Sequence, residues 1–235
     1  MELLLAATVI FVGSFVQSSI GFGLAIISAP ILFFIDPLYV PAPITVSALT
    51  LSLANARKHR HAIAFGGLRA AIIGRVPGTV AGGLLLLVID QQTLALWLGL
   101  TVLLAVLVSL TPYRFRPTSG ALFTAGFLSG FMGTSSSIGG PPMALVMQHE
   151  AGDYIRANLA AFFVVSCVLS LIMLAAVGRF GLAELTLSLP LMPATLAGYW
   201  LAMRSLKFLS LTNLRWGSLA LCALAGLFAT LSYWF

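Results

Sequence analysis

Charged side chains are scarce in this chain of 235 residues: Asp, Glu, Lys and Arg make up 8% of it, whereas 60% of the residues are apolar. A soluble protein of this length would expose more apolar surface than water tolerates, so the composition indicates an integral membrane protein in a lipid bilayer. The formal net charge of +6 comes from cations in short segments beside apolar runs, with no basic arm. We therefore expect no nucleic-acid partner and assign the cations to membrane orientation.

Cysteines and buried acids are equally scarce. The two cysteines, Cys167 and Cys222, stand alone inside apolar runs, which excludes a disulfide framework and a dithiol electron carrier. His59 and His61 lie in a basic segment with no acidic or thiolate neighbour, so we expect no metal site and no cofactor. No carboxylate is evident within an apolar run, so the commonest proton-relay group of membrane proteins is missing.

Long uncharged runs make up most of the chain. Each run is long enough to cross a hydrocarbon core of about 30 Å. The runs are Leu3 to Ile35, Pro37 to Ala56, Gln91 to Tyr113, Pro117 to Gln148, Ala157 to Gly178, Leu185 to Met203 and Trp216 to Phe235. The first lacks a basic n-region and a small-residue cleavage site, so we interpret it as part of the mature protein. The runs predict an all-α polytopic membrane protein.

The chain repeats itself at about half its own length. Ser18-Ser19-Ile20-Gly21 returns as Ser136-Ser137-Ile138-Gly139, an offset of 118. Pro77-Gly78-Thr79-Val80-Ala81-Gly82 returns as Pro193-Ala194-Thr195-Leu196-Ala197-Gly198, an offset of 116. We therefore predict two transmembrane repeats, residues 1–113 and 114–235, within one integral membrane domain. Paired halves interrupted by Gly and Pro at matching places are typical of transporters that bind substrate where the interruptions meet.

The run Leu3 to Ile35 is too long for one straight span and too short for a normal helical hairpin. We predict a break at Gly21-Phe22-Gly23, where two glycines supply backbone freedom, and a matching break at Gly139-Gly140-Pro141-Pro142. The first two elements of each repeat would thus form a broken or re-entrant pair, and the sequence leaves open which of the two it is. Pro77, Gly78 and Pro193 are interpreted as hinge or packing positions.

Each half then has five helical elements, so the second half should be inverted relative to the first. The first five are Leu3 to Ser19, Leu24 to Ile35, Ala42 to Ala56, Gly66 to Ile89 and Leu94 to Leu110. Under this count most cations fall on one side, which should be cytoplasmic. These cations are Arg57, Lys58, Arg60, Arg114, Arg116, Arg204, Lys207 and Arg215.

Uncharged hydrogen-bonding residues cluster at both breaks. The clusters are Gln17, Ser18 and Ser19 with Gly21 and Gly23, and Thr134, Ser135, Ser136 and Ser137 with Gly139 and Gly140. Irregular backbone at membrane depth requires protein cover or a wet cavity, and helix N-termini starting at the breaks favour an anion. We predict that these residues bind a small anionic substrate. The alternative is that the serines bond their own preceding carbonyls or serve close packing.

Arg75 lies about ten residues into the fourth element, a depth at which a charge is costly unless it faces a cavity or a partner. We include Arg75 among the candidate substrate-binding residues. Snorkelling of its side chain towards the cytoplasmic surface is the competing interpretation.

The stretch Gln17-Ser18-Ser19-Ile20-Gly21-Phe22-Gly23-Leu24, followed by Ala29-Pro30, resembles the TauE/SafE family of sulfite and organosulfonate exporters. The second half is similar in its run Ser129-Gly130-Phe131-Met132-Gly133-Thr134 and in Gly139-Gly140-Pro141-Pro142. The resemblance covers nearly the whole chain. It implies a multi-pass carrier in a bacterial inner membrane that moves sulfite, thiosulfate or sulfonates such as sulfoacetate, driven by an ion gradient. The residues alone reach only a small anion.

Three other classes compete with a carrier. A serine protease dyad of Ser129 and His149 lacks the spacing that such an enzyme needs, so we expect no enzymatic activity. A structural or lipid-scaffolding protein would not need two polar breaks. An anion channel, or a carrier of a different organic anion, is the main alternative. The sequence does not give the substrate, the direction, the coupling ion or the oligomeric state, and it permits a homo-oligomer.

Overall fold

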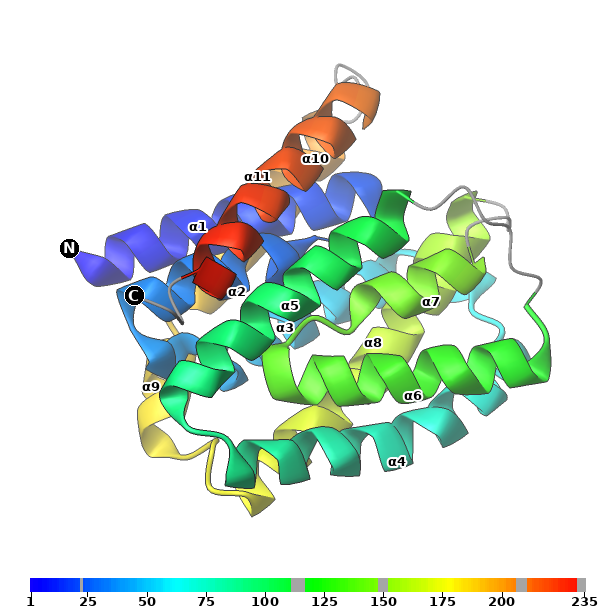
Figure 1. The fold of residues 1–235 in the computed structure, drawn as a ribbon. Coiled ribbons are helices and arrows are strands. Elements are labelled where there is room, and N and C mark those ends of the chain that lie inside the picture. The colour runs from blue at the N-terminus through cyan, green and yellow to red at the C-terminus, as the bar shows by residue number, and fades with distance from the viewer. Residues whose placement is uncertain (22, 111–116, 148–151, 206–210, 232–235) are drawn as a thin grey trace.

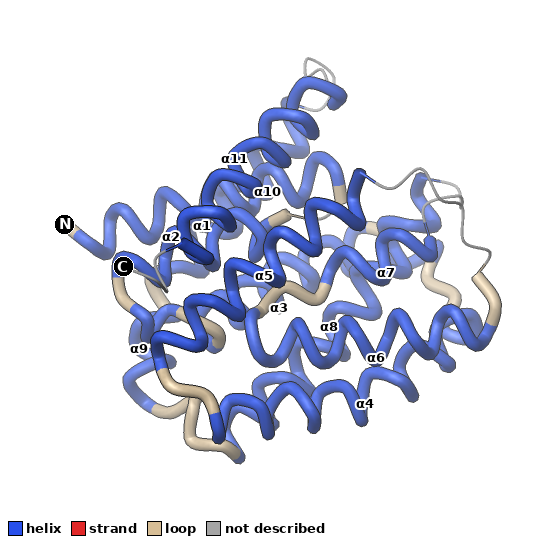
Figure 2. The backbone as a smooth tube through the Cα atoms, in the orientation of Figure 1, coloured by secondary structure: helices blue, strands red, loops and turns tan. Residues whose placement is uncertain are grey.

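The computed structural model describes residues 1–21, 23–110, 117–147, 152–205 and 211–231, and every regular element in these ranges is helical (Figures 1 and 2). The helices of the first half are α1 (Glu2–Ile20), α2 (Leu24–Ile35), η1 (Pro37–Tyr39), α3 (Ala42–Lys58), η2 (Arg60–Ala62), α4 (Phe65–Val88) and α5 (Gln91–Leu110). Those of the second half are α6 (Ser119–Ser136), α7 (Gly140–Met147), α8 (Gly152–Ala176), α9 (Leu182–Ser188), α10 (Leu191–Ser205) and α11 (Leu211–Leu231).

Both predicted helix breaks are present. α1 ends at Gly21, whose φ of 97° is left-handed and whose N–H donates to the carbonyl of Gln17 at 2.8 Å. α2 begins after Gly23, whose φ of 130° is also one that a side chain disfavours. The residue between them in the chain, Phe22, lies outside the described residues. Glycine therefore stands where the backbone of the first break demands it.

The second break has its positive-φ residue at a serine. α6 ends at Ser137, which has a φ of 64° and is the only non-glycine residue with positive φ among the described residues. α7 starts at Gly140, so Pro141 and Pro142 fall in its first turn, where a missing N–H leaves no hydrogen bond unmade. Figure 1 shows α6 running towards the middle of the molecule and α7 running back. This pair thus turns back on itself.

The helices pack in a pattern that mixes the two halves. α1 lies along α10 and α4 lies along α6, while α3 packs on α8 and α5 packs on α11 (Figure 1). Within each half, the two members of the broken pair also contact each other, α1 with α2 and α6 with α7. In the described residues, helices of the two halves therefore pack against each other.

Glycines allow α4 and α6 to approach each other closely. A Cβ at Gly74, Gly78 or Gly82, which are spaced four residues apart on α4, would overlap the carbonyl oxygens of Phe123, Phe127 and Phe131 on α6. In the other direction, a Cβ at Gly126 or Gly130 would overlap the backbone of α4. Small residues at this spacing let two membrane helices approach to backbone contact. Gly78, predicted as a hinge or packing position, is a packing residue in the structure.

The prolines of the repeated motif have different surroundings in the two halves. Pro77 lies inside α4, which continues through it. Pro193 is the third residue of α10, because the expected single run Leu185 to Met203 is divided into α9 and α10 at Leu189 and Pro190. The interruption of this run therefore precedes Pro193, which occupies a first turn instead of a helix interior.

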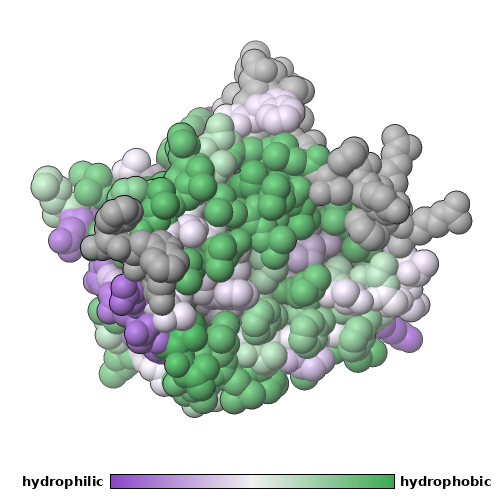
Figure 3. All heavy atoms as spheres, in the orientation of Figure 1, coloured by the Kyte–Doolittle hydropathy of each residue, from purple (hydrophilic) through white to green (hydrophobic). Residues whose placement is uncertain are grey.

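The surface matches a bilayer environment. Six helical stretches in the described residues are long and apolar enough to cross a membrane, and two shorter ones, Leu24–Ile35 and Trp216–Leu231, are apolar as well. Figure 3 shows a broad hydrophobic face over α5, α6 and α11. These helices carry exposed apolar side chains, among them Leu107, Phe123 and Leu224. The chain is therefore a multi-pass membrane protein.

The ends of the bundle differ in charge. Arg57, Lys58, Arg60 and Arg204 lie where α3 and α10 end, and the Nζ of Lys58 is 2.8 Å from the Sδ of Met203 on α10. We call this the basic end. Carboxylates instead begin α1 and α9 and occupy the connections before η1 and α5, at the opposite end. They are Glu2, Asp36, Asp90 and Glu184.

Candidate functional site

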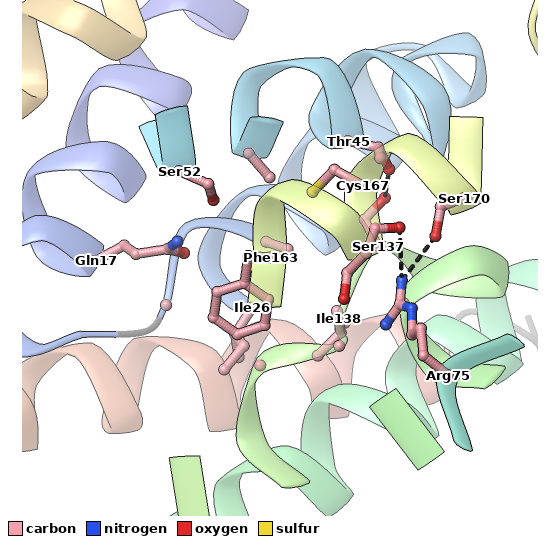
Figure 4. Close-up of a pocket in the computed structure, with 17 residues that line it drawn as sticks. Gln17, Ile26, Thr45, Ser52, Arg75, Ser137, Ile138, Phe163, Cys167 and Ser170 are labelled. Carbon is pink, nitrogen blue, oxygen red and sulfur yellow. Dashed lines mark hydrogen bonds between the residues drawn. The ribbon is translucent and has the colours of Figure 1, made fainter. Parts of the chain in front are cut away.

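A cavity of about 50 Å³ lies between the two breaks and the α3–α8 pair (Figure 4). The breaks and the helix turns beside them contribute Gln17, Gly23, Gly133, Ser137, Gly139 and Gly140. α3 contributes Thr45, Ala48 and Ser52, α8 contributes Phe163, Ser166, Cys167 and Ser170, and α4 contributes Arg75. Figure 4 shows Arg75 and Ser170 on one side of the cavity and Gln17 and Ser52 on the other. We call it the central cavity.

Arg75 is the only cation among the described residues that line the central cavity. Its side chain is 3% exposed, and the close packing of α4 on α6 brings it beside the second break. Nη1 donates to the carbonyl and, at 2.9 Å, to the Oγ of Ser129; Nη2 donates to Ser170 Oγ at 2.7 Å and to the Ser166 carbonyl at 3.2 Å. The guanidinium thus points into the protein interior, and snorkelling to the surface does not occur.

Hydroxyl groups continue the Arg75 network into the second break. Ser129 Oγ donates to the carbonyl of Gly139 at 2.6 Å, and Thr134 Oγ1 lies 2.8 Å from Ser170 Oγ. α4, α6 and α8 are therefore tied together around Arg75 without a carboxylate. The partners of the guanidinium are neutral, so its positive charge has no counterion among the described residues of the network.

Two polar atoms beside the cavity have no hydrogen-bond partner among the described residues. They are the Nε of Arg75 and the Oγ of Ser166, whose residues are 3% and 2% exposed and line the cavity. Leaving a buried donor unpaired is expected to cost about 1–3 kcal/mol, more for a charged group. No carboxylate lines the cavity among the described residues. An uncompensated cation with spare donors is suited to an anion.

The opposite side of the cavity is formed by the first break. Gln17 Oε1 accepts the N–H of Leu24 at 3.0 Å and so caps the start of α2. Ser137, from the second break, donates to the carbonyl of Pro41 at 2.7 Å and lies 3.3 Å from Thr45 Oγ1. Both side chains are half-buried and bridge a break to a neighbouring element.

The predicted serine clusters separate into two groups. Of the clusters, Gln17, Gly23, Ser137, Gly139 and Gly140 line the central cavity. The hydroxyls of the others are turned back to their own helix or to a neighbour: Ser18 to Ser14, Ser19 to Phe15, Ser135 to Phe131, Ser136 to Met132, and Thr134 to Ser170. Ser135 also accepts from Trp97 Nε1 at 2.8 Å. For Ser18, Ser19, Ser135 and Ser136, the structure agrees with the alternative interpretation of bonding within the helix.

Helices α3 and α8 supply lining residues that our sequence reasoning did not single out. Thr45, Ala48 and Ser52 of α3 correspond to Phe163, Ser166 and Ser170 of α8 at the repeat offset of 118. All six line the cavity. Applying the offset to these apolar runs would have found them, because the same positions face the centre in both halves.

The site offers no arrangement for metal or hydrolytic chemistry in the described part of the chain. No group of three or more His, Cys, Asp or Glu side chains that could hold a metal occurs there. Ser129 is buried, with its hydroxyl engaged by Arg75 and Gly139, and His149 lies outside the described residues. Nothing described at Ser129 resembles an activated nucleophile.

Comparison with known proteins identifies the family of the chain. The family model for the sulfite exporter TauE/SafE matches residues 5–229. No curated protein and no solved structure matches the chain. Because the family match extends over nearly the whole chain, including both breaks, Arg75 and the α3–α8 pair, the protein belongs to the TauE/SafE family of sulfite exporters, which are transporters and not enzymes.

Proposed function

We propose that the chain is a carrier of small sulfur-containing anions that works by alternating access around the central cavity. The candidates are sulfite, thiosulfate and organosulfonates such as sulfoacetate. The observation that carries the proposal is the buried guanidinium of Arg75, in the middle of α4, held by neutral groups beside a cavity without a carboxylate. A charge at this depth in a membrane protein marks a substrate pathway by default.

The size of the cavity supports a compact oxyanion. The central cavity of about 50 Å³ admits only a compact ligand. A sulfite ion has four heavy atoms. In the proposal its oxygens accept hydrogen bonds from Arg75 Nε and Ser166 Oγ. One neutral hydroxyl and one cation hold such an ion without trapping it.

The helix contacts support an inverted repeat. If α1 to α5 correspond to α6 to α8 and α10 to α11, then α1 on α10 and α6 on α4 are equivalent contacts, and α3 on α8 and α5 on α11 are self-paired. That exchange is what a two-fold axis between the halves would produce. Rocking of one half against the other about the cavity is the alternating-access step we propose.

We also propose that the basic end faces the cytoplasm of a bacterium and that the acidic end faces outward. The support is the excess of Lys and Arg in the short connections at the basic end. Short loops rich in Lys and Arg lie on the cytoplasmic side of membrane proteins. Ion-gradient coupling is part of the same proposal. No carboxylate lines the central cavity among the described residues, so a coupled proton would travel on the substrate instead of on an acidic side chain.

Flux measurements in proteoliposomes test this function. We expect saturable uptake and efflux of radiolabelled sulfite or sulfoacetate that respond to an imposed pH gradient. Flux that is linear in concentration would instead indicate a channel. Absence of flux for sulfite, thiosulfate and sulfoacetate in protein that elutes as a single species would overturn the assignment of substrate class.

Replacement of Ser166 by Ala is expected to raise the KM for the anion about two- to tenfold, because one neutral hydrogen bond contributes about 0.5–1.5 kcal/mol. The Ser166 hydroxyl has no partner in the part of the chain that the structure describes, so thermal stability should not fall. Ser136→Ala is the matched control, since Ser136 is equally buried but bonds Met132 within its helix. Equal KM values for the two variants would remove Ser166 from the site.

A further inference from the structure

A second, smaller cavity of about 40 Å³ lies between the central cavity and the basic end. It is formed where α1 and α3 end and α8 begins. Ser18, Asn55 and Arg156 are among its polar lining residues. We call it the vestibule.

The vestibule has the chemistry of an anion site. Arg156 is half-buried, and no carboxylate lines the vestibule among the described residues. Asn55 also lines the vestibule, and its Nδ2 donates to the Leu51 carbonyl at 3.1 Å, which leaves the second amide hydrogen of Nδ2 for a ligand. A small anion would meet a cation and an amide there without an opposing charge.

The vestibule and the central cavity are separate positions on one path. Gln17, Ser52 and Phe163 line both cavities and therefore stand between them. Arg156 and Ser166 are ten residues apart on α8, which places them about 15 Å apart along the helix axis. A small anion can contact one of them at a time. Passage between the two positions requires the side chains of Gln17 and Phe163 to move aside.

The repeat does not provide a second vestibule of this kind. At the offset of 118, Arg156 corresponds to Leu38, an exposed apolar residue of η1 near the acidic end. The positive charge of the vestibule is therefore an asymmetric addition to otherwise paired halves. An anion site with Arg156 would serve one face of the membrane.

We propose that the vestibule is a second anion-binding site, in which Arg156 and Asn55 hold the transported oxyanion before or after the central cavity, with Gln17, Ser52 and Phe163 as the partition. This inference rests on the proposed function for the identity of the anion. It identifies Arg156 as a binding residue and predicts that its effect is confined to one face of the membrane, neither of which follows from the family assignment.

Initial rates in right-side-out and inverted membrane vesicles test the vestibule. Arg156→Gln should raise the KM for sulfite about tenfold for transport that starts at the basic end, because a charge-assisted hydrogen bond is lost. The KM from the acidic end should stay unchanged, and Arg156→Lys should recover most of the loss. Arg57→Gln is the control, since it removes the same charge from an exposed position at the same end. If Arg156→Gln and Arg57→Gln raise this KM equally, the change would be an effect of surface charge, and the proposal of an anion site in the vestibule would be wrong.

A measurement of equilibrium binding is a second test of the vestibule and does not depend on transport. Purified Arg75→Gln protein should still bind radiolabelled sulfite at millimolar concentration, and the Arg75→Gln/Arg156→Gln protein should not. Loss of all binding in Arg75→Gln alone would overturn the vestibule even if wild-type transport is normal. Binding that depends on Arg156 in a wild type that transports no sulfur anion would keep the vestibule and overturn the proposed function. Size-exclusion profiles establish that each variant is folded.

Discussion

Replacement of Arg75 by Gln is expected to lower kcat/KM for sulfite about ten- to hundredfold, because hydrogen bonds to a charged group contribute about 1.5–3 kcal/mol. Gln can still reach a hydroxyl, but it leaves the cavity without a positive charge, since Arg75 is the only cation among the described lining residues. The anion would then lose its water shell with no compensating charge. The measurement is the initial rate of sulfite flux in proteoliposomes at concentrations below KM.

Arg69→Gln is the matched control for this prediction. Arg69 lies six residues earlier on the same helix and is exposed, so its replacement removes the same charge without touching the cavity. Arg75→Lys should retain part of the activity, because Lys keeps the charge but loses the planar fork that reaches Ser129 and Ser170 together. Wild-type flux in Arg75→Gln would mean that Arg75 is a structural residue and that the anion binds elsewhere.

The positions of the helix breaks could be predicted from length and glycine content. A 33-residue apolar run between Leu3 and Ile35 fits neither one span nor two, and the pair Gly21 and Gly23 offered the place for a turn. The structure places positive φ values there. The division between α9 and α10 was missed, because the run Leu185 to Met203 is uncharged and long enough for a single span.

The orientation of individual hydroxyls was not predictable from clustering. Successive residues on a helix point about 100° apart, so the four consecutive side chains Thr134 to Ser137 are unable to face one cavity. Only Ser137 lines it, and it does so because the helix ends there with a left-handed residue. The cluster of polar residues thus predicted the region of the cavity, but the rotation of the helix determines which of these side chains lines it.

The partners of Arg75 depend on tertiary contacts that no local pattern contains. Ser129 lies on α6 and Ser170 on α8, 54 and 95 residues away in the chain. The glycine spacing on α4 was visible in the sequence as Gly74, Gly78 and Gly82, but nothing there identified α6 as the helix it packs against. Hence the depth of Arg75 pointed to a buried charge, and only the fold shows which hydroxyls hold it.

The second large effect is expected from Gly78. Replacement by Ala should destabilise the protein by about 3 kcal/mol or more, because the new Cβ would overlap the carbonyl oxygen of Phe127 and backbone atoms have no alternative rotamer. Relief requires α4 and α6 to separate along their length, which also moves Arg75 away from Ser129. The loss of stability is measured by heating the protein in detergent and determining, by size-exclusion chromatography, the fraction that remains monodisperse. Gly78→Val should be worse than Gly78→Ala.

Gly66→Ala makes the same chemical change on the same helix without the steric conflict, because a Cβ at Gly66 meets no atom within 4 Å. It should leave stability unchanged or raise it by up to about 1 kcal/mol through helix propensity. A midpoint for Gly78→Ala equal to that for Gly66→Ala would show that α4 and α6 do not touch at this position. In that case glycine packing between α4 and α6 would not explain the position of Arg75. A low midpoint for Gly78→Ala alone, with residual flux reduced in the folded fraction, would tie helix packing to the anion site through one backbone contact.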